Sequence, residues 1–395
     1  MKWEERLRAQ MPQNKLASAG MMCTYCDLGP CVINPFDEEP QVGACGIDAE
    51  NMNYVNLGMN VVKGLSDYNV TNGLSLSLDR MLGPDHTAGV TMKDILDASS
   101  SILDVSKEVV SSWDSEQRKP REVEQGIGVL QKDSVNIVLA VYEPEMIKIS
   151  RSQKMRSLAR ENNARGINLV GALCGGAEAS YNHGIPLLGG TEQLEEAADM
   201  IDYVYQGGDY AKACEKAVEN FSKRDKAAFR HFTPKRYSTG HDLNNDAINE
   251  AVDRGIIRGV VALMGCEHGK STWNMDELVD ELSENDFMVI NLGCHLRGAA
   301  PGEKSCALLN EYGIPCVLNA GCCEPGKVLG LKELTVVMPR WREPRMLTAA
   351  FAFASAGIPV ILGILPYVVP EVYNKLIDAG IKVEKDSSKV MELLR

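Results

Sequence analysis

Hydrophobic and polar positions along the chain follow two different rhythms, and the change falls near residue 130. Before it, residues 49–66 and 91–111 carry apolar positions at helical spacing, so we expect two helices there. From residue 134 onward, short runs of branched apolar residues such as VNIVLAV, INLVGAL, GVVALMG and FMVINLG alternate with helical stretches. Strands that alternate with helices pack as parallel sheets, so this part of the chain is expected to be α/β.

Two blocks of this alternation predict two Rossmann-like parallel-sheet domains behind a small helical N-terminal region. We expect the helical region at residues 1–130, the middle domain at 131–235 and the C-terminal domain at 236–395, within a length of 395 residues. The polar stretches 112–126 and 222–247 are expected to be an exposed connection and a domain boundary.

Residues 348–370 carry no charge and have about the length of a membrane span. The AGIP tetrapeptide at 356–359 divides this stretch into a helical part and a short branched run, so we expect buried helix and strand with no membrane span. The N-terminal MKWEERLRAQ lacks the apolar core of a secretory signal, which predicts a cytoplasmic protein. The net charge of −13 disfavours nucleic acid and anionic membranes as partners.

Four cysteines near the N-terminus follow the spacing C-x2-C-x4-C-x13-C. They are Cys23, Cys26, Cys31 and Cys45. Four thiolates are the usual ligand set of a [4Fe–4S] cluster, so the helical region is expected to bind one. Zinc is the alternative, but zinc sites usually pair two C-x2-C hairpins, and Cys31 and Cys45 do not form one. Disulfides are disfavoured in a chain without a visible export signal.

Five more cysteines lie in loops directly after predicted strands. They are Cys174, Cys266, Cys294, Cys322 and Cys323. In open α/β sheets, ligands collect outside the carboxyl ends of the strands, so we expect these thiols to converge on one buried point. Thiolates favour iron–sulfur clusters, zinc and copper(I). The alternative for any one of these residues is an inert buried cysteine with no metal. This interpretation is less convincing when several strand ends each carry a thiol.

The loop after Cys266 imitates a phosphate-binding P-loop, because Gly269-Lys270-Ser271 follows a predicted strand. A P-loop needs four residues between its glycines, and only three separate Gly265 from Gly269, so ATP binding is not expected. His268 in this loop is a candidate catalytic group beside the thiols, and an ordinary exposed loop residue is the alternative.

The two cysteine groups together resemble those of the anaerobic nickel–iron carbon monoxide dehydrogenases and the related hybrid-cluster proteins. The dehydrogenases' [4Fe–4S] motif is similar to the segment CTYCDLGPCVINPFDEEPQVGACG. Parts of their two sheet domains are similar to five further segments: VNIVLAVYEPEM, INLVGALCGGAEASYNHGIPL, GVVALMGCEHGK, NDFMVINLGC and PCVLNAGCCEPGKV. The resemblance implies that four cysteines match four of the family's five cysteine ligands to the active-site cluster: Cys174, Cys266, Cys294 and Cys323. It also implies a redox enzyme, a ferredoxin-like electron carrier and a homodimer.

Several positions depart from the dehydrogenase pattern. The family's histidine ligand lies in a His-Gly-His-x-Pro stretch, and here residues 140–144 read Ala-Val-Tyr-Glu-Pro. No cysteine follows the strand IDYVYQ, and Arg345 stands where the family has a catalytic lysine. Met22 replaces the cysteine of a cluster shared between subunits, which weakens the expectation of a homodimer. Efficient CO oxidation and a nickel site are therefore disfavoured, because acid–base partners and nickel support are both missing.

The stretch from Trp341 to Arg345 is similar to the W-Y-E-Q-K stretch of hybrid-cluster proteins, whose glutamate ligates an iron–sulfur–oxygen cluster. Glu343 and Glu178 are therefore candidate oxygen ligands, since oxygen suits more oxidised iron, and Glu343 and Arg345 are candidate catalytic residues. The alternative is that Glu343 only stabilises the N-terminus of a helix, where the helix dipole favours a negative charge.

These observations predict an iron–sulfur redox enzyme with an electron-transfer [4Fe–4S] cluster and a second, variant iron–sulfur or iron–sulfur–oxygen cluster. The expected reaction is reduction of a small, hydroxylamine-like molecule. A true nickel–iron CO dehydrogenase is one alternative, and a non-catalytic electron carrier, redox sensor or metal-assembly factor is another.

Overall fold

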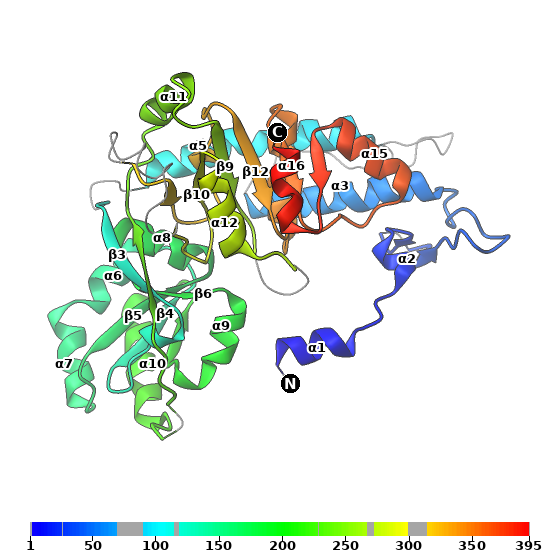
Figure 1. Cartoon of the computed structure of the whole chain (residues 1–395). Helices are drawn as coiled ribbons and strands as arrows, with labels where there is room; N and C mark the ends of the chain where they lie inside the picture. Colours follow the sequence, from blue (N-terminus) through cyan, green and yellow to red (C-terminus); the bar gives the residue numbers. More distant parts are fainter. Residues whose placement is uncertain are drawn as a thin grey trace.

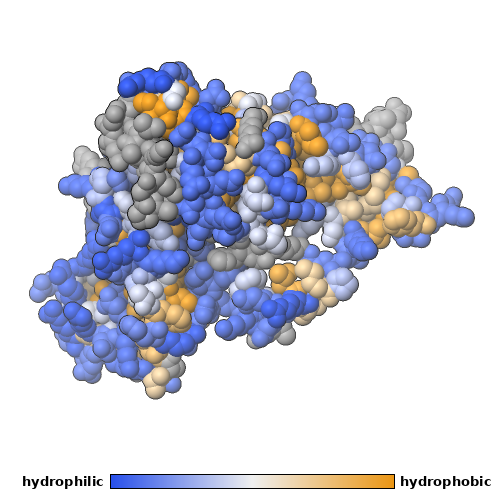
Figure 2. Space-filling model, in the orientation of Figure 1, coloured by the Kyte–Doolittle hydropathy of each residue, from blue (hydrophilic) through white to orange (hydrophobic). Residues whose placement is uncertain are grey.

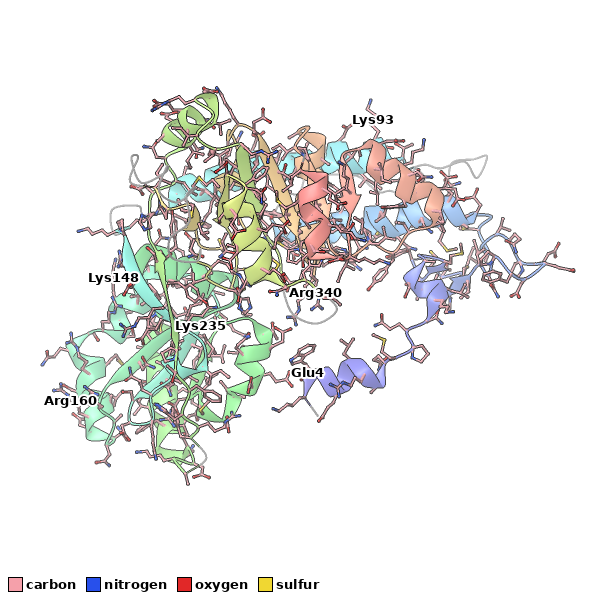
Figure 3. All side chains as sticks on the ribbon, viewed as in Figure 1. Glu4, Lys93, Lys148, Arg160, Lys235 and Arg340 are labelled. Carbon is pink, nitrogen blue, oxygen red and sulfur yellow. The ribbon has the colours of Figure 1, made fainter. Side chains whose placement is uncertain are left out.

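The computed structural model describes residues 2–25, 27–68, 90–113, 118–227, 229–266, 272–298 and 314–394. Figure 1 shows the middle sheet at the lower left, the C-terminal sheet above it, and an N-terminal segment at the right. Two of the predicted site residues, Cys26 and His268, lie outside the described residues. The labelled Lys93, Lys148 and Arg160 lie at the periphery, where their charged groups are solvated (Figure 3).

The described helices are α1 (Trp3–Ala9), α2 (Lys15–Ser18), α3 (Ala49–Asp67), α5 (Met92–Ser112), α6 (Pro144–Ser150), α7 (Gln153–Glu161), α8 (Leu173–His183), α9 (Thr191–Glu196), α10 (Tyr210–Lys223), α11 (Asn245–Asp253), α12 (Met275–Glu284), α14 (Pro344–Ser355), α15 (Pro370–Asp378) and α16 (Val390–Leu393). The described strands are β1 (Met22–Cys23), β2 (Cys31–Val32), β3 (Arg121–Gln125), β4 (Val135–Leu139), β5 (Ile167–Ala172), β6 (Leu187–Gly189), β7 (Tyr203–Tyr205), β8 (Lys235–Thr239), β9 (Gly259–Leu263), β10 (Phe287–Asn291), β11 (Val317–Asn319), β12 (Leu334–Met338), β13 (Val360–Leu362) and β14 (Ile381–Val383).

The C-terminal sheet is parallel throughout, in the order β11-β10-β9-β12-β13-β14. Every residue of β9 and β10 is buried, as expected for parallel strands covered on both faces. The strand order reverses beside β9, because β10 follows on one side and β12 lies on the other. This reversal leaves a crevice at the carboxyl ends of β9 and β12, which is where α/β proteins bind ligands.

The middle sheet has the order β7-β4-β5-β6-β3-β8, and its β3–β8 pair is antiparallel. The prediction that 112–126 is only an exposed connection was wrong, because β3 lies within it. The polar segment 222–247 likewise contains β8. Strand β8 forms the sheet edge, and β3 lies next to it. Both strands are rich in charge: Val123 is the only buried residue of β3, and Glu124 pairs with Arg236 of β8 at 3.0 Å. The division into three domains stays a prediction.

The two predicted N-terminal helices are confirmed as α3 and α5, and both pack against α14. Helix α14 is buried from Met346 to Ala354, which explains why its sequence carries no charge there. The uncharged stretch 348–370 is thus a buried helix followed by the short strand β13, as predicted. Within the described ranges, we find no helix with the length and apolar character needed to cross a bilayer.

Helices α3 and α14 cross closely at Gly64. A Cβ atom on this residue would lie 2.0 Å from Thr348 Oγ1 and 2.8 Å from the Pro344 carbonyl oxygen. We expect Gly64→Ala to lower the free energy of unfolding by about 1–3 kcal/mol, since overpacking outweighs the gain in helix propensity. Urea unfolding measures this. Gly166→Ala is the control, because a Cβ there meets nothing within 4 Å, and equal stability of the two variants would contradict the close crossing.

Candidate functional site

Strand ends from both sheets deliver cysteines to one cavity of about 530 Å³. Cys174 lies in the first turn of α8, directly after β5, and the other four follow β9, β10 and β11. All five predicted strand-end cysteines line the cavity: Cys174, Cys266, Cys294, Cys322 and Cys323. The ends of α3 and α5 close it through Tyr68 and Trp113. Cys174 is exposed to the cavity, whereas Cys322 and Cys323 are buried in its wall.

Three of these thiols interact. The proximity of Cys294 and Cys323 lowers the pKa of Cys174 well below its ordinary value. The proximity of Cys174, together with burial, raises the pKa of Cys294 and Cys323 well above the ordinary value. The Cys323 thiol donates a hydrogen bond to the Leu292 carbonyl oxygen at 2.9 Å. Burial also raises the pKa of Cys266 to about 12. Binding of metal at the cysteines with a raised pKa would release protons.

The cavity has both the ligand atoms and the volume that a metal cluster needs. Among the described residues, no group of three or more His, Cys, Asp or Glu side chains is arranged to hold a single metal ion. A cluster of several irons occupies more space than one ion and contacts its thiolates through different metal atoms. A thiol-lined cavity of about 530 Å³ fits such a group by donor type and by size.

Glu178, a predicted oxygen ligand, is fully buried and forms an ion pair with Lys327. Its carboxylate also accepts hydrogen bonds from Asn182 Nδ2 at 2.7 Å and from the Cys322 backbone N–H at 3.1 Å. Both carboxylate oxygens therefore already have protein donors. Lys327 donates a further bond to the Ala320 carbonyl oxygen at 2.6 Å. These contacts hold the loop that carries Cys322 against α8.

Arg345, a predicted catalytic residue, lies in the first turn of α14 and lines the cavity. Its guanidinium pairs with the buried Glu324 carboxylate and lies 4.5 Å from the centre of the Tyr68 ring. Glu324 also accepts a hydrogen bond from Ser106 Oγ at 2.7 Å. Burial acts to lower the pKa of Arg345, but Tyr68 and Glu324 raise it above its ordinary value. Arg345 is therefore a fixed positive charge.

Glu343 and Arg342 lie at the carboxyl end of β12, on the cavity wall. Glu343 occupies the N-cap position of α14, yet its side chain makes no capping hydrogen bond. Arg342 donates to Thr191 Oγ1 at 2.6 Å and lies 3.7 Å from Glu192. Arg342 thus links the C-terminal sheet to α9 of the middle sheet beside the cavity.

Of the N-terminal cysteines, Cys23, Cys31 and Cys45 lie within the described residues, around the small antiparallel pair of β1 and β2. Cys23 and Cys31 lie directly opposite each other in this pair. The Ala44 backbone N–H donates to Cys31 Sγ at 3.3 Å, which brings the loop containing Cys45 beside the pair. Gly43 permits this approach, because a Cβ there would lie 2.9 Å from Ile47 Cγ2.

The predictions from sequence missed most of the polar groups around the thiols. The sequence did not mark five of these groups as site residues, although four of them lie in segments that resemble the family: Glu324, Lys327, Tyr68, Tyr142 and His183. The one available signal was the Glu-Pro-Gly-Lys sequence directly after Cys323.

Comparison with known proteins identifies the family. Residues 21–95 and 198–386 match the Prismane/CO dehydrogenase family, and the chain belongs to it. It is 22% identical to carbon monoxide dehydrogenase 2 of Carboxydothermus hydrogenoformans over 293 residues, covering 50% of this chain and 46% of that protein. It is 23% identical to carbon monoxide dehydrogenase 1 of Methanosarcina mazei over 372 residues, covering 70% of this chain and 59% of that protein. The match thus spans about half of the length of these relatives.

Solved structures show the same fold. Carbon monoxide dehydrogenase IV from Carboxydothermus hydrogenoformans superposes with a TM-score of 0.78 at 19% identity, covering 100% of this chain and 95% of that chain. Nickel-free carbon monoxide dehydrogenase from Thermococcus sp. AM4 gives a TM-score of 0.75 at 20% identity, covering 100% and 93%. The family resemblance and the α/β fold class predicted from the sequence are therefore confirmed.

Proposed function

We propose that this chain is an iron–sulfur redox enzyme that reduces a small, hydroxylamine-like molecule in the thiol-lined cavity. The convergence of five cysteines from four strand ends on one cavity carries this proposal. Four thiols and one carboxylate would hold the cluster: Cys174, Cys266, Cys294, Cys323 and Glu343. Thiolates suit iron–sulfur clusters, and a carboxylate suits more oxidised iron.

The bound cluster supplies electrons and open metal positions, and the protein groups around it contribute fixed charge and shape. Arg345, held by Glu324, favours negative charge that develops in the cavity. Lys327 is paired with Glu178, so its charge is largely committed to holding the cysteine loop. The limited volume of the cavity restricts the substrate to a small molecule.

True CO dehydrogenase activity is the second candidate, because the family and its named relatives favour it. Two features of the cavity count against it. Tyr142 lines the wall within the stretch where the family resemblance expects the histidine ligand. Arg345 replaces the expected lysine, and a guanidinium that stays protonated cannot serve as a proton donor and acceptor. A non-catalytic role as electron carrier, redox sensor or metal-assembly factor predicts that no substrate is turned over.

Metal analysis of anaerobically reconstituted protein separates these candidates. We expect about eight irons per chain without nickel, and Mössbauer and EPR spectra of two distinct clusters. Glu343→Gln should keep the irons but change the spectrum of the second cluster alone, because a neutral amide is a weaker ligand than a carboxylate. Nickel near one per chain would favour the dehydrogenase, and about four irons would exclude the second cluster.

The N-terminal segment is the proposed docking surface for a ferredoxin-like electron carrier. Its exposed large apolar side chains are Met11, Leu28, Val32, Phe36 and Val42. Phe36 is 92% exposed, and Figure 2 shows apolar atoms beside a hydrophilic tip on this segment at the right of the molecule. Between Lys15 and Lys63 the sequence has six acidic residues and no basic residue. We therefore expect the carrier to present an apolar centre with a basic rim.

A homodimer would shorten the electron route. Cys45 precedes α3 and Tyr68, which lines the cavity, follows it. The 19 residues of α3 span about 28 Å at 1.5 Å per residue. Electron tunnelling falls steeply with distance, so direct transfer along one chain would be slow. We propose a dimer in which the N-terminal cysteines of one protomer approach the cavity of its partner.

A further inference from the structure

Tyr68 lies on the cavity wall at the C-terminal end of helix α3. The residue is only 6% exposed. Its hydroxyl is buried and has no hydrogen-bond partner within the part of the chain that the structure describes. A buried polar group without a partner costs free energy, so folded proteins contain few of them. An unpartnered donor in a cavity wall is suited to bind a molecule inside the cavity.

Two other phenols, one on the cavity wall and one on helix α8, do have partners. The Tyr142 hydroxyl lies 3.0 Å from Nε2 of His183. The Tyr181 hydroxyl donates to the backbone carbonyl oxygen of His241 at 2.9 Å. The unpartnered hydroxyl is therefore a property of Tyr68 and not of every tyrosine around the cavity.

Arg345 brings a second unpartnered donor beside the first. Its guanidinium lies 4.5 Å from the centre of the Tyr68 ring, and its Nη2 donates to Glu324. Its Nε is buried and has no hydrogen-bond partner among the described residues. An arginine side chain has donors and no acceptor, so it cannot accept the proton of the Tyr68 hydroxyl. Two neighbouring donors, Tyr68 Oη and Arg345 Nε, thus lack an acceptor in the described chain.

The charges that act on the Tyr68 hydroxyl place it near the thiols. Burial raises the pKa of Tyr68, and the positive charge of Arg345 opposes this effect. The charges of Glu324 and Cys323 raise the pKa of Tyr68 further. Both of these groups line the cavity, and the effect of a charge falls with distance, so the hydroxyl end of the ring lies toward them. A protonated phenol can donate a hydrogen bond.

We propose that Tyr68 donates a hydrogen bond to the small molecule that binds in this cavity, beside the positive charge of Arg345. The ligand class is a small molecule whose outer atom carries a lone pair and a partial negative charge, because both unpartnered groups are donors and one of them is a cation. This inference rests on the proposed function, since it requires the second cluster to bind that molecule.

Urea unfolding of the full-length protein without metal tests whether the hydroxyl has a protein partner. Tyr68→Phe should unfold at the same or a higher urea concentration, because it removes a buried group that has no partner. Tyr181→Phe is the matched control and should unfold at a lower urea concentration, since it breaks the bond to His241. A lower midpoint for Tyr68→Phe would overturn the inference, because its hydroxyl would then serve the protein itself.

Cyanide is the probe for ligand binding, because its C–N stretching band in the infrared spectrum reports a hydrogen bond to its nitrogen atom. The full-length protein is reconstituted anaerobically, its iron is counted, and cyanide is added to the reduced form. Tyr68→Phe should shift the band and weaken cyanide binding about tenfold, the loss expected for one hydrogen bond. Tyr181→Phe should leave the band and the affinity unchanged, because Tyr181 does not line the cavity.

The cyanide experiment separates failure of this inference from failure of the proposed function. An unchanged band and affinity in Tyr68→Phe would overturn the inference alone, and so would a protein with about eight irons that binds no cyanide. A count of about four irons would overturn the proposed function and this inference with it, because no second cluster is then present.

Discussion

Cys174→Ala is expected to leave about four irons per chain, against about eight in the unaltered protein, because only the N-terminal cysteines then hold a cluster. Cys174 is central to the cavity, since it interacts with both Cys294 and Cys323. Reduction of hydroxylamine by the reconstituted protein should fall to background. Iron analysis, EPR spectroscopy and a steady-state assay with a reduced viologen as electron donor measure these effects.

Cys214→Ala is the matched control. Cys214 is buried in α10 and does not line the cavity, so its removal should leave the iron content and turnover unchanged. The EPR signal of the N-terminal cluster should survive in both variants, because neither Cys174 nor Cys214 belongs to the N-terminal cysteine group. Full turnover with about eight irons in Cys174→Ala would show that the strand-end cysteines hold no second cluster.

Lys327→Met is expected to lower the free energy of unfolding by about 3–5 kcal/mol, because it leaves the buried Glu178 carboxylate without its cation. Both side chains of this pair are almost fully buried, at 3% and 1% exposure, so water cannot replace the lost partner. Lys327 also lies 4.9 Å from the centres of the Trp113 and Tyr181 rings, and the variant loses these contacts too. Chemical unfolding of the metal-free protein measures the loss.

Lys332→Met makes the same substitution at an exposed pair. Lys332 bonds Asp253 on the surface, with side-chain exposures of 53% and 56%, so we expect a change below about 1 kcal/mol. The double variant Glu178→Gln with Lys327→Met should recover part of the stability, since no unpaired charge remains buried. If Lys327→Met is no less stable than Lys332→Met, the buried pair does not stabilise the cysteine loop.

Much of the fold was predictable because apolar periodicity is a local property. The runs around β4, β5, β9 and β10 are mostly apolar, since both faces of a parallel sheet are covered. The edge strand β8 and its neighbour β3 were missed for the opposite reason. Their charged side chains face solvent, and a strand with one or no buried face carries little apolar signal.

The placement of the cysteines was also predictable, because parallel strands end at the same edge of a sheet. Cys174 and Cys266 come from different sheets, yet both line the same cavity. Glu178 illustrates the limit of this reasoning. Its position near Cys174 suggested a metal ligand, and only the structure revealed that Lys327, from a loop 149 residues away, pairs with its carboxylate.

The sequence by itself determined the order of strands and helices, the family, and the strand ends at which the thiols lie. These properties follow from the spacing of residues along the chain, which the sequence records directly. Only the tertiary structure decided which groups surround the thiols, including Arg345 with Glu324 and Tyr142 with His183. The paired residues are 21 and 41 positions apart in the chain, and their contacts form only when the segments around each sheet fold together.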